Sequence, residues 1–131
     1  MGWDPATVPD PQDPQTFANS KLDWSEPYPE SGDAGQHGRL LGLYRDLLAL
    51  RRARPELTDP RFSEISIDFD ADARWLVLGR GDLVVAVNLG DQTLDLELDG
   101  KLLLSTGTGV TLDEHLSLPP RTAAILDTVA G

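Results

Sequence analysis

Hydrophobic side chains recur at three- and four-residue intervals between residues 36 and 57, and this spacing predicts an amphipathic helix. The apolar stripe comprises Leu40, Leu43, Tyr44, Leu47, Leu48 and Leu50. Asp33 is the expected N-cap, because Gln36 follows it at the spacing of a capping box. Arginine side chains crowd the last turn, where cations oppose the negative end of the helix dipole. Pro55 is expected to end the helix.

An alternation of apolar and polar side chains replaces this pattern further along the chain, and it predicts β-strands. Ile65, Ile67 and Phe69 share one side of the first strand, which predicts that this side packs in a hydrophobic core. Two stronger apolar runs follow and are expected to turn at residues 79–82. The pair Asp99 and Gly100 is a preferred two-residue hairpin turn.

The number of these strands decides the predicted fold class. Six to eight short strands joined by tight turns predict an antiparallel β-sandwich over residues 60–131. The chain is therefore expected to be mainly β, with an irregular arm over residues 1–35 and one amphipathic helix ahead of the sandwich.

The arm at residues 1–35 combines two features that rarely occur together. It contains six of the ten prolines, which fix φ and disfavour helix in the preceding residue, so an extended and irregular course is expected. It also contains half of the aromatic side chains, which are Trp3, Phe17, Trp24 and Tyr28. Because disordered linkers are poor in aromatic residues, we expect an ordered loop that lies against a surface.

Charge and composition narrow the function classes. The 131 residues include 22 acidic and 11 basic side chains, for a net charge of −11. Such a charge repels phosphate backbones and anionic membrane surfaces, so neither nucleic acid nor a membrane is an expected partner. There is no cysteine, which excludes disulfides and thiolate metal sites and suits a cytoplasmic protein. No signal peptide is recognised at the N-terminus.

Candidate chemistry in the residues themselves is sparse. His37 and His115 have no neighbours at metal-ligand spacing, so no metal or other cofactor is expected. The aspartates at positions 68, 70 and 72 are spaced as in a calcium loop, but Ala73 stands where the turn glycine belongs, and a solvated hairpin turn is the better interpretation. Residues 80–82 spell the integrin tripeptide Arg-Gly-Asp, although their place between two strands favours a structural turn.

The arm also carries a family resemblance. Residues 8–24 read VPDPQDPQTFANSKLDW, and this segment resembles the stretch that follows the last barrel strand in the maltooligosyl trehalose trehalohydrolases, members of the α-amylase family of glycoside hydrolases. Residues 37–57 resemble the last helix of their (β/α)8 barrel. The pattern LVVAVNLGDQTLDLEL, followed by LLLSTG and LSLPPRTAAIL, resembles their C-terminal β-sandwich.

The resemblance implies a parent enzyme that releases trehalose by hydrolysing the α-1,4 bond beside it. The motifs around the family's catalytic aspartates and glutamate match nothing in this chain, so no catalytic residue is carried over. Loops at the C-terminal ends of barrel strands build the active site in such enzymes. The candidate substrate-binding residues are therefore Asp10, Gln12, Asp13, Phe17 and Trp24. The alternative is that the aromatic residues of the arm only anchor it by packing.

The resemblance also implies partners. The first is the catalytic barrel, for which residues 1–35 would be a barrel loop and residues 36–57 the last barrel helix. An α-glucan contact and homo-oligomers through the exposed helix face are further expectations. The other function class left open is a stand-alone module of β-sandwich type that binds carbohydrate or another protein.

Overall fold

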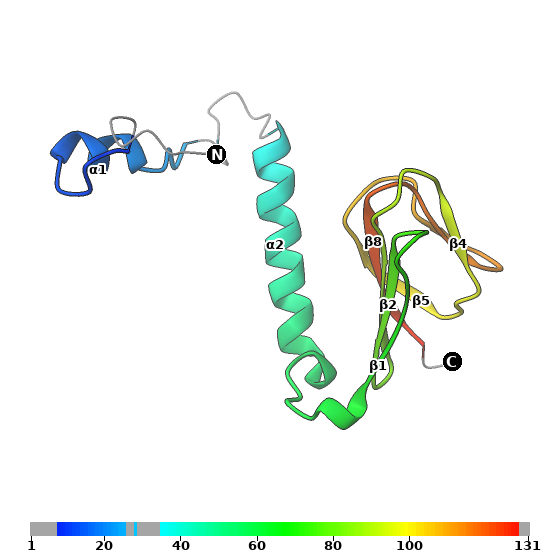
Figure 1. Cartoon of the computed structure of the whole chain (residues 1–131). Coiled ribbons are helices and arrows are strands. Elements are labelled where there is room, and N and C mark those ends of the chain that lie inside the picture. Colours follow the sequence, from blue (N-terminus) through cyan, green and yellow to red (C-terminus); the bar gives the residue numbers. More distant parts are fainter. Residues whose placement is uncertain (1–7, 26–27, 29–34, 129–131) are drawn as a thin grey trace. The chain divides into compact units, whose positions relative to one another are not determined.

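The computed structural model of the chain describes residues 8–25, 28 and 35–128 (Figure 1). Trp3 and the expected N-cap Asp33 lie outside the described residues. The chain divides into two compact units, Met1–Leu41 and Gly42–Gly131.

The first unit contains a helix that the sequence reasoning missed. Helix α1 spans Pro14–Ser20, so the expectation of a wholly irregular arm is wrong. Asp13 is its N-cap, and the Asp13 side chain accepts a hydrogen bond from the backbone N–H of Gln15. Proline is favourable at the first helical position, because the N–H that it lacks has no partner there in any case. Pro14 therefore begins this helix, although the prolines were predicted to prevent helix in the arm.

Helix α2, Gly35–Ala53, confirms the predicted amphipathic helix and crosses the boundary between the two units. It ends before Pro55 because the residue ahead of a proline avoids helical dihedrals, and Arg54 is extended at φ −116° and ψ 105°. None of its side chains is fully buried, and Leu40, Tyr44 and Leu48 of the predicted stripe are exposed. Two 3-10 turns, η2 at Pro55–Leu57 and η3 at Phe62–Glu64, follow it.

The rest of the second unit is an antiparallel β-sandwich, as predicted (Figure 1). A five-stranded sheet has the order β1-β2-β3-β8-β5, and a three-stranded sheet has the order β4-β7-β6. The strands are β1 (Ile65–Asp70), β2 (Trp75–Arg80), β3 (Leu83–Asn88), β4 (Leu94–Leu96), β5 (Lys101–Ser105), β6 (Thr111–Leu112), β7 (Leu116–Leu118) and β8 (Thr122–Asp127). All paired strands are antiparallel, with a register shift in β5 between Leu102 and Leu104.

The hydrophobic core lies between the two sheets. Its buried members are Ala86, Leu116, Leu118, Ala124 and Leu126. Partly buried side chains such as Val77 and Val84 pack against them from the five-stranded sheet. These side chains come from the inner face of that sheet.

The apolar side of β1 does not belong to this core, so the prediction that it packs there is wrong. Ile67 and Phe69 are 60% and 64% exposed. They pair with Leu78 and Leu76, which lie on the face opposite to the core residue Val77. Alternation therefore predicted the strand correctly, but it could not tell which side of the sheet the second sheet covers.

Of the two predicted hairpins, the first is confirmed and the second is wrong. Gly81 and Asp82 connect the paired strands β2 and β3, and Gly81 has φ +58°, as the tight turn requires. Asp99 and Gly100 do not form a hairpin, since β4 and β5 belong to different sheets. They lie instead where the chain crosses from one sheet to the other.

Candidate functional site

The five candidate substrate residues lie in and around α1. Their acidic members already support the local backbone. Asp10 Oδ1 accepts a hydrogen bond of 2.9 Å from the backbone N–H of Gln12, and Asp13 Oδ1 accepts one of 2.7 Å from that of Gln15. Such bonds organise the turn and the start of the helix. Both carboxylates are nevertheless exposed, as is Gln12.

The aromatic candidates are strongly exposed. Phe17 lies on α1 with 76% of its surface accessible, and Trp24 lies in the turn after α1 with 74% accessible. That turn is held by Asp23, whose Oδ1 accepts bonds from the backbone N–H and the hydroxyl of Ser25. The hydroxyl bond, followed by the backbone bond, lowers the pKa of Asp23. Asp13 and Phe17 are four residues apart, so they lie on one face of the helix.

A second group of charged side chains lies where α2 ends and the sandwich begins, and the sequence reasoning had not identified it. Arg54 Nη2 lies 2.9 Å from Glu56 Oε1, and Arg54 Nη1 donates to Asp127 Oδ2 at the end of β8. The bond to Glu56, followed by that to Asp127, raises the pKa of Arg54, while Arg54 lowers the pKa of Glu56. One guanidinium thus joins the helix end to the last strand. Nothing in the local sequence indicates a partner 73 residues away.

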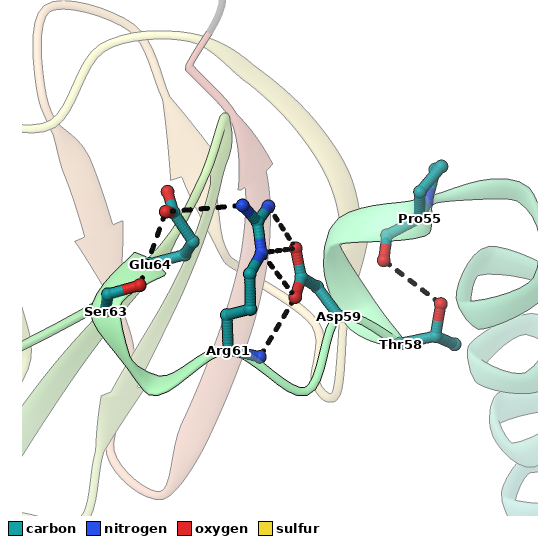
Figure 2. A network of polar contacts seen from close by, with 6 residues as sticks. All are labelled: Pro55, Thr58, Asp59, Arg61, Ser63 and Glu64. Atoms are coloured by element: carbon teal, nitrogen blue, oxygen red, sulfur yellow. Dashed lines mark hydrogen bonds and ion pairs between the residues drawn. The ribbon is translucent and has the colours of Figure 1, made fainter.

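The connection from η2 to β1 holds a second arginine pair (Figure 2). Arg61 Nη2 donates to Asp59 Oδ2 at 2.6 Å, and Arg61 Nε lies 3.0 Å from both Asp59 oxygens. Arg61 Nη1 also lies 3.7 Å from Glu64 Oε1. The hydrogen bond from Arg61 lowers the pKa of Asp59 to about 2. The Asp59 carboxylate is thus held ionised by arginine, which suits a fixed structural charge and not proton transfer.

This pair has a consequence for acid stability. The pKa of Asp59 in the folded chain is about 2, below its ordinary 3.8, so its contribution to stability is complete above pH 4 and is lost as the pH falls towards 2. We expect the Asp59→Asn variant to lose less of its free energy of unfolding than the wild type over this interval. Urea unfolding at a series of pH values measures it. If the free energy of unfolding changed with pH equally in the variant and the wild type, the prediction would be wrong.

The aspartates at positions 68, 70 and 72 and His115 all lie at exposed positions. Asp70 Oδ1 accepts from the backbone N–H groups of Asp72 and Ala73, both at 2.8 Å, and so closes the turn after β1. His115 Nε2 lies 3.7 Å from Asp95 Oδ1 on an exposed surface. Within the described ranges, no group of three or more histidine or acidic side chains is arranged to hold a metal ion. Among the helices searched there, none is long and apolar enough to cross a membrane.

A family match over the sandwich identifies the class of protein. Residues 60–125 match the family DUF3459, described as a domain of unknown function, and the chain belongs to this family. A solved structure, the putative alpha amylase from Salmonella typhimurium, is similar with a TM-score of 0.65 and 28% identity. The match covers 91% of this chain and 20% of that one.

The curated relatives are more specific. Malto-oligosyltrehalose trehalohydrolase of Rhizobium sp. (strain M-11) is 50% identical over 128 residues, which cover 96% of this chain and 21% of the relative. The enzyme of the same name from Mycobacterium tuberculosis (strain CDC 1551 / Oshkosh) is 39% identical over 125 residues, 95% of this chain and 21% of the relative. The resemblance to these hydrolases is thus confirmed. The chain spans about a fifth of the length of the curated relatives it matches.

Proposed function

We propose that this chain is a non-catalytic C-terminal region of a glycoside hydrolase that releases trehalose from maltooligosyl trehalose, and that its sandwich supports the catalytic barrel. The observation that carries the proposal is the 50% identity over nearly the whole chain to a trehalohydrolase about five times longer. In this proposal residues 1–35 form a barrel loop, residues 36–57 the last barrel helix, and residues 60–131 the C-terminal domain.

The electrostatics of four carboxylates fit the non-catalytic role. A retaining glycosidase needs one carboxyl group whose pKa is raised, so that it can protonate the leaving group. Asp23, Glu56, Asp59 and Asp91 all have lowered pKa values because each accepts hydrogen bonds, chiefly from serine or arginine side chains. These four carboxylates are therefore poorly suited to act as the acid.

The first test compares the chain alone with a hybrid enzyme. The hybrid enzyme is the Rhizobium relative in which the segment matching this chain is replaced by this chain. We expect no trehalose release from maltooligosyl trehalose by the purified chain, because in this proposal the chain has no catalytic carboxylates. In the hybrid, the Rhizobium part supplies them. The hybrid is expected to release trehalose. Turnover by the chain alone would overturn the proposal, as would an inactive hybrid.

We further propose that the arm contacts an α-glucan through Asp10, Gln12, Asp13, Phe17 and Trp24. The exposed rings of Phe17 and Trp24 offer apolar faces for sugar rings, and the neighbouring polar groups offer hydrogen-bond partners for hydroxyls. A contact of this kind would deliver binding energy away from the scissile bond.

The contact predicts a change in substrate binding. In the hybrid enzyme we expect Phe17→Ala or Trp24→Ala to raise KM about 3- to 10-fold, the effect of losing about 1 kcal/mol of stacking. Steady-state kinetics measures it. Val8→Ala serves as the control, because Val8 is another exposed apolar side chain of the same segment. A KM unchanged in both aromatic variants would favour the packing role for this arm.

A further inference from the structure

The outer surface of the five-stranded sheet has an apolar area over β1, β2 and β3. Six side chains form this area, here called the outer apolar face: Ile67, Phe69, Leu76, Leu78, Val85 and Val87. Residues that pair directly across antiparallel strands lie on the same side of a sheet. The register pairs Phe69 with Leu76 and Leu76 with Val87, and the second row joins the other three residues in the same way.

This face is distinct from the core between the sheets. The residues that alternate with it along β2 and β3, such as Val77 and Ala86, belong to the core cluster. On the same side of the sheet, Arg80 pairs with Ile65 and Leu83, so one charged side chain borders the outer apolar face. Ile67 and Phe69 are 60% and 64% exposed, and the other four are half-buried. Sheets with both faces apolar are typical of sheets that are covered on both sides.

The chemistry of the face limits what covers it. A sugar needs hydrogen-bond partners beside the aromatic ring, and none of the six side chains supplies one. A second copy would bring another net charge of −11 close by, and such repulsion opposes association. An apolar surface of a neighbouring domain in the same polypeptide has neither disadvantage. The relatives have such additional chain, since this sequence matches only 21% of their length.

We infer that the outer apolar face is the docking surface for the catalytic domain. The inference rests on the proposed function and specifies which surface performs it. Docking removes Ile67 and Phe69 from water, so the two edge-strand residues contribute to the stability of the whole enzyme and not to that of the chain alone.

The test uses the double variant Ile67→Asp/Phe69→Asp in the free chain and in the hybrid enzyme. In the free chain we expect an unchanged unfolding transition, because both side chains are exposed there. In the hybrid we expect the unfolding temperature to fall by at least about 5 °C, because two charges must be buried or the domains must separate. Phe62→Asp is the matched control. Phe62 is also strongly exposed, at 87%, but lies in η3 ahead of β1 and is not part of the face.

Four further outcomes would contradict the docking surface, the proposed function or both. An active wild-type hybrid in which the double variant behaves like Phe62→Asp would overturn this docking surface and leave the proposed function standing. An inactive wild-type hybrid that unfolds in two independent transitions would overturn both. Equal destabilisation of the free chain would show that the two residues serve the sandwich itself. Self-association of the wild-type chain in sedimentation, abolished by the double variant that leaves the hybrid unchanged, would assign the face to a second copy.

Discussion

Replacing Gly100 by alanine is expected to lower the free energy of unfolding of the chain by about 3 kcal/mol, the upper end of the cost of a strained backbone position. Gly100 has φ +137°, a conformation that residues with a Cβ rarely adopt. A Cβ at this position would overlap the backbone carbonyl oxygen of Asp127 and lie 3.0 Å from its carbonyl carbon. Because the obstacle is backbone, the crossing between the sheets or the end of β8 must move.

The control for this prediction is Gly42→Ala in helix α2. A Cβ at Gly42 meets nothing within 4 Å, and alanine is favoured over glycine in a helix by about 1 kcal/mol. The same glycine-to-alanine change should therefore stabilise the chain at one position and destabilise it at the other. Urea unfolding followed by circular dichroism measures both. Equal midpoints for Gly100→Ala and the wild type would contradict the prediction.

Replacing Asn88 by alanine is expected to have a similarly large effect, a loss of about 3 kcal/mol, because several buried polar groups lose their partner at once. Asn88 is 1% exposed at the end of β3. Its Nδ2 donates to the carbonyl oxygens of Leu118 at 2.9 Å, Pro119 at 3.1 Å and Gln92 at 2.8 Å. Its Oδ1 accepts from the N–H of Gly90 at 2.9 Å.

These four bonds join the end of β3 to the loop that enters the second sheet and to the end of β7. Gln92→Ala is a suitable control, since Asn88 bonds to the backbone of Gln92 and its exposed side chain is not needed. We expect that variant to unfold within about 0.5 kcal/mol of the wild type. Thermal and urea unfolding measure both variants. A stability of Asn88→Ala close to that of Gln92→Ala would contradict the role given to this side chain.

Much of the fold was predictable because its signals are local. The spacing of leucines predicted α2, and the alternation of apolar residues predicted the strands of a sandwich. The errors about the hairpin and about the buried side of β1 share one cause. Asp99 and Gly100 look like a hairpin turn, but whether two strands pair depends on partners far along the chain: β4 pairs with β7, and β5 pairs with β8. Local sequence contains no information on that choice.

The candidate site was also predictable only in part. The resemblance of residues 8–24 to the trehalohydrolases identified five candidate residues, but the prolines concealed α1, although Asp13 followed by Pro14 is a regular helix start. The contact between Arg54 and Asp127 was not predictable, since it requires β8 to end beside the end of α2. Whether the five residues contact a sugar stays a prediction.

The sequence by itself determined the helix, the strands and the family, because periodicity and motif are properties of neighbouring residues. Only the tertiary structure decided which side of each strand is covered. Ile67 and Phe69 have the pattern of core residues, yet the three-stranded sheet packs on the opposite face of their sheet. The physical reason is that alternation divides a strand into two sides, while the packing of distant strands determines which side faces water.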